Sequence, residues 1–418
     1  MQIKTLLSQC YPLKSFIYGK TYIDPNSTQK KIIVEIMPRS NSKPICSGCS
    51  KTAPGYDCSQ KKRSFEFVPM WGFAVFFLYA LRRVDCSNCG VKTELVPWAD
   101  KGCTLTKPYQ LFLAHWAKKL SWKETAEAFA STWYKVHSSV KSVVEYGLKN
   151  RDLSEVISIG IDEVQWRCGH NYITLVYQID DTRKRLLHVA NKRTVKSLLS
   201  FFRMMGDQRN AKIQYVCSDM WKPYLKVIKK KIPQALHILD RFHIVANLNK
   251  AVNEVRAAEA KKMKQEGYED LITHTKYCFL KNPENLTPKQ ETKLVDVLQY
   301  DLKSVKAYLL KESFQVLWTY SSPYWARWFL KKWCTRAMKS RLDPIKKFAK
   351  SMRKHEPLIM NYFKAKKSLS SGVVEGLNRK VNLTTRKAYG FRTLDGLETA
   401  LYHTMGHLPE PELTHRFF

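Results

Sequence analysis

The spacing of hydrophobic residues changes along this chain and predicts a different kind of structure in each stretch. Aromatic and apolar residues alternate with polar ones between Ser64 and Val84, which predicts a β-hairpin in a stretch rich in Ser, Pro, Gly and Cys. From about residue 104 to 150 the spacing is helical, and Ser121 with Glu124 has the pattern of a capping box at the start of the second of three helices. A short helix, a tight turn and a further helix are typical of a helix-turn-helix.

Short β-branched and apolar runs begin at residue 156 and predict strands. The predicted strands cover residues 156–161, 172–179, 185–189, 213–218 and 237–240, with helices at 195–205 and 223–231 between the later strands. Three antiparallel strands followed by alternating helices and strands is the element order of an RNase H-like core. Residues from about 250 to 365 have only helical spacing, so they predict an all-helical insertion into that core.

The charge of the chain points to a polyanionic partner. Its 418 residues contain 71 Lys+Arg against 36 Asp+Glu, a net charge of +35. Nucleic acid is the expected partner, because every phosphate that a cation neutralises releases a counterion. An anionic membrane surface is the alternative, but the sequence has no clean basic amphipathic anchor. The longest apolar stretch, residues 73–81, is about half of what a bilayer span needs, so no membrane association is expected.

The cysteines form two short-spaced pairs. Cys46-x-x-Cys49 and Cys86-x-x-Cys89 have the spacing of two zinc knuckles, so we expect a structural Zn²⁺ held by four thiolates in a zinc-ribbon-like module. Four free thiols in a small core are the alternative, and Cys58 and Cys103 are further candidate ligands. Eleven cysteines are too few for a disulfide scaffold in a chain of this length. A reducing, cytoplasmic location is therefore expected.

The sequence thus predicts a multidomain α+β protein with five parts. In chain order these are an N-terminal region with a four-cysteine zinc finger (1–100), a helix-turn-helix DNA-binding domain (101–150), the first part of an RNase H-like catalytic core (151–250), the helical insertion (251–365) and the final part of the core (366–418).

Three carboxylates stand out as a candidate active site. Asp162 and Asp219 each follow a predicted strand, and Glu375 lies on a later helix predicted to start near Ser370 or Ser371. An aspartate after a strand is often only a turn or helix cap. Two acids at strand ends and one on a helix, however, suit a site for two Mg²⁺ or Mn²⁺ ions acting on a phosphodiester. On the predicted helix a stripe of amide and basic residues shares the face of Glu375, and these are candidate DNA contacts: Asn378, Arg379, Asn382 and Arg386.

The sequence around these acids resembles the ISL3 insertion-sequence family of DDE transposases. The resemblance covers nearly the whole chain and is carried by three segments: Ile159-Gly160-Ile161-Asp162-Glu163, Ser218-Asp219-Met220-Trp221 and Val373-Val374-Glu375-Gly376-Leu377-Asn378. It implies an enzyme that binds the terminal inverted repeats of its element, hydrolyses the phosphodiester at the element end and joins the freed 3′-hydroxyl to target DNA. It also implies Asp162, Asp219 and Glu375 as catalytic metal ligands, and a bacterial, nucleoid-associated protein.

Asp240 and His243 resemble the Asp-x-x-His element that follows the second aspartate in several DDE families. His243 either orients a phosphate or pairs with an acid, or it packs as an ordinary histidine at a helix start. Glu163 is not expected to bind metal, because it points to the opposite face of a continuing strand.

Two further surfaces are predicted to contact DNA. The third helix of the helix-turn-helix carries polar residues that suit base edges or phosphates, although a plain trihelical spacer is the alternative: Lys135, His137, Ser139 and Lys141. Tryptophans and tyrosines gather in the insertion around Trp325. They either stack on an unpaired base or pack a helical core.

Three functions fit the sequence. A transposase acting as a homodimer or larger oligomer on DNA is the first. A structure-specific nuclease or resolvase with the same metal core is the second, and a domesticated DNA-binding regulator is the third. The three intact acids favour an active enzyme.

Overall fold

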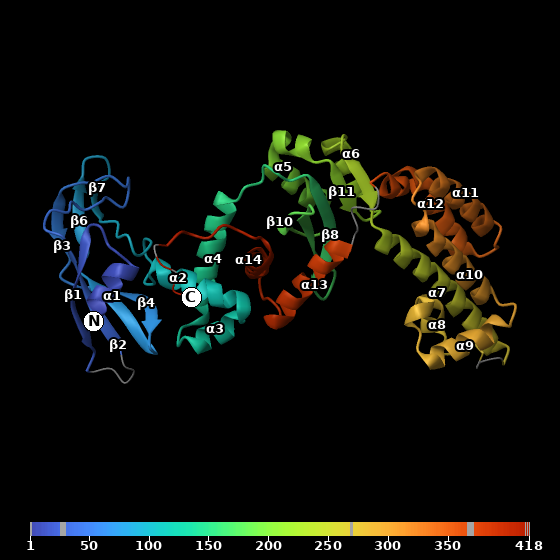
Figure 1. Ribbon diagram of the computed structural model, residues 1–418, viewed down its shortest axis with the longest axis horizontal. Helices are drawn as coiled ribbons and strands as arrows, with labels where there is room; N and C mark the ends of the chain where they lie inside the picture. The colour runs from blue at the N-terminus through green and yellow to red at the C-terminus, as the bar shows by residue number, and fades with distance from the viewer. Residues whose placement is uncertain are drawn as a thin grey trace. The chain divides into compact units, whose positions relative to one another are not determined.

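The computed structural model describes residues 2–25, 31–267, 271–365, 372–413, 415 and 417. Its contacts divide the chain into two compact units (Figure 1). The first unit contains residues 1–152 together with 381–418, and the second contains residues 153–380. The observed elements bear out a mixed α and β protein. In the described residues, no helix has both the length and the apolar character needed to cross a membrane.

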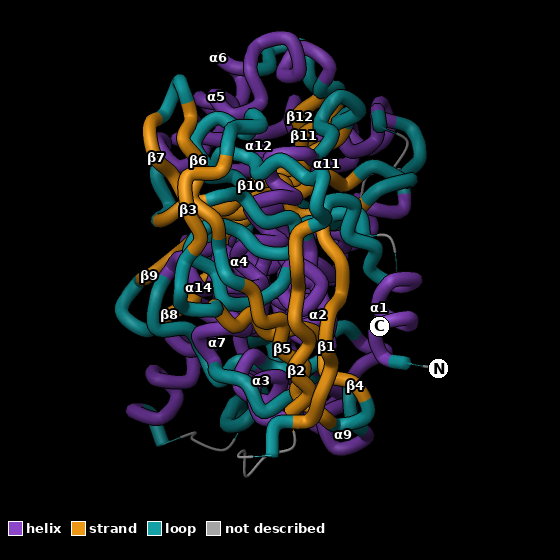
Figure 2. Tube along the Cα trace, turned by 90° about the vertical axis from the view of Figure 1, so that its left-hand side faces the viewer, coloured by secondary structure: helices purple, strands orange, loops and turns teal. Residues whose placement is uncertain are grey.

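The first unit begins with helix α1 (Ile3–Cys10) and two small sheets. The larger sheet has the order β1-β2-β5-β4, in which β2 and β5 are parallel, and Figure 2 shows its strands β1 and β2 side by side. The smaller sheet has the order β3-β6-β7. The predicted hairpin is present as β4 and β5. The strand bounds are Phe16–Ile23 (β1), Lys31–Pro38 (β2), Gly55–Cys58 (β3), Arg63–Met70 (β4), Phe73–Tyr79 (β5), Arg82–Cys86 (β6) and Gly90–Thr93 (β7).

Aromatic side chains form the core of this N-terminal part. Phe65, Phe67 and Phe77 are fully buried, and Phe67 stacks on Phe77 with ring centroids 4.5 Å apart. Trp98, which follows the last strand, packs edge-on against Phe65. Burial of such large rings contributes more than any polar contact to holding small sheets together.

The three helices predicted between residues 104 and 150 are present with nearly the predicted bounds. They are α2 (Lys107–Lys119), α3 (Trp122–Ala128) and α4 (Trp133–Asn150). The capping box forms as the sequence predicts: Glu124 N–H donates to the Ser121 hydroxyl, and the Glu124 carboxylate accepts from Ser121 N–H at 2.7 Å. Two reciprocal bonds fix the start of a helix that has only seven residues.

The C-terminal segment packs on this helical domain, which differs from the predicted division. Helix α14 (Leu394–Met405) lies against α4, although residues 366–418 were expected to complete the catalytic core. Gly147 of α4 shows how closely the chain approaches there, because a Cβ at this position would lie 2.5 Å from Leu408 Cβ. The sequence carries no signal for this contact, because it depends on the match between two distant apolar surfaces.

The second unit is built on a five-stranded sheet of order β10-β9-β8-β11-β12. β8, β9 and β10 are antiparallel neighbours, whereas β11 is parallel to both β8 and β12. Helices α5 (Val195–Lys212) and α6 (Lys222–Lys231) share a hydrophobic core with the sheet through residues such as Phe201 and Tyr224. The strand bounds are Ser158–Arg167 (β8), Asn171–Ile179 (β9), Lys184–Asn191 (β10), Tyr215–Ser218 (β11) and Leu236–Leu239 (β12).

Strand β8 is longer than predicted, so Asp162 lies within a strand and not at its end. The segment after Asp162 continues to pair with β9, from Glu163 opposite Thr174 to Arg167 opposite Asn171. Its polar residues alternate with Val164 and Trp166, because this end of the hairpin is partly exposed. The sequence prediction ended the strand where the apolar run ended, and cross-strand pairing extends it.

The described residues between 251 and 365 form helices joined by turns and short irregular segments, with no strand among them. The core of this insertion contains Phe314, Trp333 and Met352, while Trp318 packs on Phe363 with nearly parallel rings. The helices are α7 (Arg241–Gln265), α8 (Lys276–Leu280), α9 (Pro288–Leu298), α10 (Lys303–Gln315), α11 (Pro323–Met338) and α12 (Asp343–Lys364), with 3-10 turns at Pro283–Asn285 and Val316–Thr319. Helix α13 (Gly372–Lys387) follows, and the boundary between the two units falls within it.

Candidate active site

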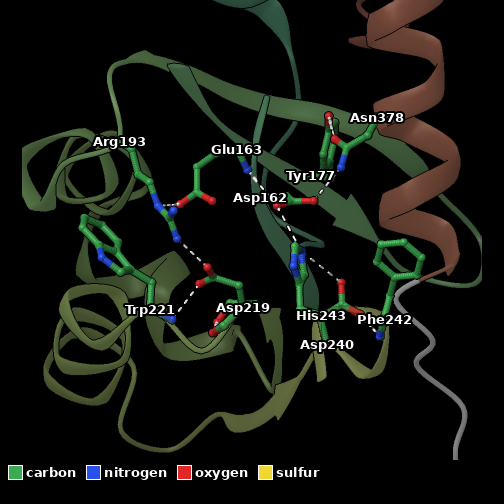
Figure 3. Close-up of polar contacts among 11 residues, drawn as sticks. Asp162, Glu163, Tyr177, Arg193, Asp219, Trp221, Asp240, Phe242, His243 and Asn378 are labelled. Atoms are coloured by element: carbon green, nitrogen blue, oxygen red, sulfur yellow. Dashed lines mark hydrogen bonds and ion pairs between the residues drawn. The ribbon is translucent and has the colours of Figure 1, made fainter. Parts of the chain in front are cut away.

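Three aspartates come from three neighbouring strands of the central sheet. Asp162 lies in β8, Asp219 directly follows β11, and Asp240 directly follows β12. These strands are parallel neighbours in the order β8-β11-β12, and because Cys217 pairs with Gly160, Asp162 lies level with Asp219 at the edge where β11 and β12 end. Figure 3 shows the three side chains with their polar partners. The side chains of Asp162, Asp219 and Asp240 are only 13%, 14% and 10% exposed, so their charges face a partly desolvated environment.

Asp162 is held by residues from two other elements. Asn378 on α13 donates through Nδ2 to Asp162 Oδ2 at 2.6 Å, and the Tyr177 hydroxyl donates to Asn378 Oδ1 at 2.8 Å. His243 Nε2 lies 3.7 Å from Asp162 Oδ1 and 3.8 Å from Asp240 Oδ2. Pairing with Asp162, together with the charge of Asp240, raises the pKa of His243 to about 9. In this structure His243 therefore lies within ion-pair distance of two acids.

Asp219 is held by a backbone amide and by an arginine. Trp221 N–H donates to Asp219 Oδ1 at 2.9 Å, and Arg193 Nη2 donates to Asp219 Oδ2 at 2.5 Å. Arg193 Nε also lies 3.1 Å from Glu163 Oε1. Glu163 is therefore close to this site, although it does not lie with Asp162. Burial, and then the charge of Asp219, raise the pKa of Glu163 to about 7.

Helix α13 is packed directly onto β8. Val374 lies against Gly160, where an added Cβ would come within 2.5 Å of Val374 Cγ2. Glycine at this position lets the helix approach the strand two residues before Asp162. Val374, Leu377 and Val381 form the buried side of α13. Asn378 thereby reaches Asp162.

Glu375 lies in the first turn of α13 and forms an ion pair with Arg379, whose Nη2 is 2.6 Å from Glu375 Oε1. The Glu375 side chain is 40% exposed. No contact between Glu375 and Asp162 or Asp219 is found among the described residues. The structure thus places Glu375 one helical turn from Asn378 but does not bring it onto the two aspartates.

The donor set at this edge fits divalent metal ions. Carboxylate oxygens are hard ligands of the kind that Mg²⁺ and Mn²⁺ prefer, and backbone and side-chain donors already orient Asp162 and Asp219. The carboxylates do not form a closed cage in the described part of the chain. There, a set of three or more ligand atoms within 4.8 Å of one another is found at the cysteines alone.

That cluster consists of Cys46, Cys49, Cys86 and Cys89, as the spacing predicts. Cys49 Sγ and Cys86 Sγ are 3.6 Å apart, close to the roughly 3.8 Å expected for thiolates around one tetrahedral zinc. The Gly48 N–H donates to Cys46 Sγ, and this bond, with the Cys49 amide, lowers the pKa of Cys46 to about 7. The cluster suits a metal that binds thiolates.

The predicted polar contacts on α4 mostly have partners inside the protein. Lys135 Nζ is 2.5 Å from Glu66 Oε2, and Lys141 Nζ is 3.0 Å from Asp395 Oδ1. His137 stacks on Trp133 at a 5.0 Å centroid separation. Ser139 is buried and donates to the carbonyl of Lys135, so its side chain does not reach the surface. The exposed side chains at the start of α4 are aromatic ones that sequence reasoning did not select: Trp133 and Tyr134.

The aromatic residues of the insertion separate into two groups. Trp318 and Trp333 are buried in its core, which agrees with the packing alternative. Trp325, Trp328 and Tyr324 are exposed on α11, and Lys332 Nζ lies 3.7 Å from the centroid of the Trp328 ring. The exposed group has no role in the core and combines aromatic surface with positive charge.

Comparison with known proteins agrees with this site. Residues 159–401, which contain all three candidate acids, match the ISL3 family of DDE transposases. The chain is 28% identical over 404 residues to the transposase for insertion sequence element IS1557 of Mycobacterium tuberculosis, covering 91% of this chain and 90% of that protein. It is 25% identical over 333 residues to the transposase for insertion sequence element IS1001 of Bordetella parapertussis, covering 79% and 81%.

The chain is strongly basic, has a sheet edge with oriented carboxylates, and has transposase relatives over nine-tenths of its length. Together these features define a DNA-cutting and DNA-joining enzyme. The chain belongs to the ISL3 family of DDE transposases. The resemblance read from the sequence is thereby confirmed. DDE transposases carry out DNA cleavage and strand transfer with divalent metal ions.

Proposed function

We propose that this transposase binds the terminal inverted repeats of an insertion sequence, cuts at their ends and joins the freed strands to target DNA. The observation that carries the proposal is the placement of Asp162 and Asp219 on adjacent parallel strands, with the helix of Glu375 packed onto β8. The strand order and the three antiparallel strands agree with an RNase H-like core interrupted by the helical insertion.

Asp162, Asp219 and Glu375 would hold two Mg²⁺ or Mn²⁺ ions. When bound, such ions activate the attacking hydroxyl and stabilise the leaving oxygen. The protein's own contribution is orientation. Asn378 and His243 hold Asp162, and the Trp221 amide holds Asp219. In this proposal Glu375, whose side chain is partly exposed, leaves Arg379 to join them.

The DNA-binding surfaces are proposed from charge and exposure. Arg379, Asn382 and Arg386 are exposed along α13, and they suit the scissile strand. Asn378 is assigned to Asp162 and not to DNA. At the helix-turn-helix we keep Lys135, His137 and Lys141, omit the buried Ser139, and add the exposed Tyr134. The exposed group around Trp325 suits stacking on unpaired bases.

A strand-transfer assay tests the proposed function. The protein is incubated with Mg²⁺, a labelled duplex that carries the element end, and a target plasmid. We expect cleavage at the end and joining of the labelled 3′-end to the plasmid. Cleavage of branched DNA without joining would identify a nuclease or resolvase instead, and end binding without cleavage would identify a DNA-binding regulator.

Replacing Arg379 should affect catalysis more than DNA binding. Arg379 lies one helical turn beyond Glu375, and its side chain is 75% exposed, so it is placed to position the cut strand. For Arg379→Ala we expect cleavage to fall by about a hundredfold, as for loss of one charged transition-state donor. End binding and its salt dependence should change by no more than about one phosphate contact.

Lys380→Ala is the matched control, because Lys380 is also exposed but lies about 100° further around the helix. Cleavage rate and end binding are measured for both variants across a salt series. If Arg379→Ala lowers both quantities together, or if it behaves like Lys380→Ala, the basic stripe beside Glu375 has no catalytic role.

A further inference from the structure

Arg193 occupies a central position in the candidate active site that its place in the sequence does not reveal. It lies in the short loop between β10 and α5, outside every motif that the sequence analysis selected. Its guanidinium is within ion-pair distance of both Asp219 and Glu163 (Figure 3). Its Cζ lies 4.7 Å from the centroid of the Trp221 ring, so the side chain is supported by an aromatic face as well as by two acids.

The loop that presents Arg193 is held on both sides. Lys192 has a φ of +65°, a left-handed conformation that is costly for a residue with a side chain. Hydrogen bonds hold this conformation: Lys192 N–H donates to the Tyr172 carbonyl, and the Thr174 hydroxyl donates to the Lys192 carbonyl at 2.8 Å. Thr194 then caps α5 through the amide of Ser197. A strained residue fixed by its surroundings beside a catalytic site suggests that the placement of Arg193 matters.

Arg193 reduces the electrostatic repulsion between two acids. Glu163 and Asp219 are both largely buried, and the charge of Asp219 disfavours ionisation of Glu163. One guanidinium lies within ion-pair distance of both and offsets part of this repulsion. It also engages Glu163, which holds that carboxylate away from the proposed metal ligands. Glu163 is then the anchor of Arg193 and not a ligand.

The same contact sets up a competition for Asp219. Oδ1 of this carboxylate accepts from a backbone amide, whose position is fixed, and Oδ2 accepts from Arg193. Whether a divalent ion binds Oδ1 or Oδ2 of Asp219, the positive charge of Arg193 lies nearby and repels it. The arginine is the partner that can yield, because its side chain is 36% exposed and retains Glu163 and Trp221 when it releases Asp219.

We propose that Arg193 is a positioning residue that holds Asp219 in the metal-free enzyme and opposes binding of the divalent ion there. This inference rests on the proposed role of Asp219 as a metal ligand. It follows that loss of the charge at position 193 tightens binding of the ion. The repulsion between Arg193 and the ion is removed, and Glu163 becomes an additional carboxylate ligand. Cleavage slows nonetheless, because Glu163, no longer held by Arg193, competes with Asp219 for the ion and draws it out of position.

Binding of Mn²⁺ to the full-length, zinc-loaded protein without DNA tests the inference, using the electron paramagnetic resonance signal of free Mn²⁺. For Arg193→Gln we expect Mn²⁺ affinity to rise by on the order of tenfold, the size expected for removing one nearby charge in a solvated site. Cleavage at saturating Mn²⁺ should fall at least about tenfold. Arg193→Lys, which keeps the charge, should bind Mn²⁺ like the unmodified protein and recover part of the cleavage.

Two further variants complete the design. Arg203→Gln removes an exposed charge from α5 and should leave Mn²⁺ affinity unchanged. Glu163→Gln combined with Arg193→Gln should reverse part of the affinity gain. The inference is overturned if Arg193→Gln binds Mn²⁺ equally well or more weakly, or if Arg193→Lys matches Arg193→Gln. Asp219→Asn distinguishes a failure of the proposed metal site from a failure of the proposed role of Arg193. If Asp219→Asn keeps full Mn²⁺ binding, the proposed metal site is wrong. If Asp219→Asn loses Mn²⁺ binding while Arg193→Gln has the Mn²⁺ affinity of the unmodified protein, only the proposed role of Arg193 is rejected.

Discussion

Asp162→Asn, Asp219→Asn and Glu375→Gln are each expected to reduce cleavage at the element end by about a thousandfold or more. Removing one charged ligand costs several kcal/mol of transition-state stabilisation, and each 1.4 kcal/mol is a factor of about ten in rate. Binding to the element end should remain nearly unchanged, because these acids repel phosphates. Cleavage is followed on a labelled end with Mg²⁺, and binding is followed by gel shift without metal.

Asp207→Asn is a suitable control, because Asp207 is an exposed aspartate on α5 in the same unit. The Glu375 variant is the most informative of the three, since Glu375 is paired with Arg379 in this structure. Cleavage at the normal rate by any one variant removes that residue from the proposed metal site.

Loss of the four-cysteine cluster is expected to unfold the small module around it. Cys46 and Cys86 are buried, and the hydrophobic cluster there otherwise contains only Ala53 and Val84 with the partly buried Cys49 and Cys89. So few apolar side chains cannot hold a fold, whereas a structural zinc supplies roughly 10–16 kcal/mol of binding free energy. Cys46→Ser or Cys89→Ser should therefore abolish zinc binding, expose β3, β6 and β7 to proteolysis and weaken binding to the element ends.

Cys58→Ser serves as the matched control, because Cys58 is an exposed cysteine of the same small sheet and lies outside the cluster. Zinc content by elemental analysis, limited proteolysis and end binding are compared among the variants. A folded, protease-resistant protein that contains no zinc would show that the cysteines are simply packed thiols.

Local patterns in the sequence predicted the features that depend on local physics. The capping box at Ser121 and the two cysteine pairs are examples, since each is defined by a few neighbouring residues. The position of Asp219 directly after a strand was also predictable, because an apolar, β-branched run ends just before it. These features place one of the candidate acids and the metal cluster.

Features that depend on distant contacts were not predictable. Strand β8 continues past Asp162 because β9 pairs with it, not because its own residues are apolar. The sequence around Lys135 and Lys141 predicts exposed side chains. In the fold, however, they form ion pairs with Glu66 and Asp395, which are distant in the sequence. Arg193 belongs to the same class. A lone arginine in a short loop carries no signal until the fold places two carboxylates around it.

The central claim is that Asp162, Asp219 and Glu375 together hold the catalytic metal ions. A crystal structure of the protein with Mn²⁺ and a DNA end, with anomalous scattering measured for Mn²⁺, tests this claim most directly. We predict two anomalous peaks, with Asp162 and Asp219 as ligands and with Glu375 turned from Arg379 onto one of the ions. Peaks at Asp162 and Asp240 that leave Glu375 paired with Arg379, or no peak at Asp219, would contradict it.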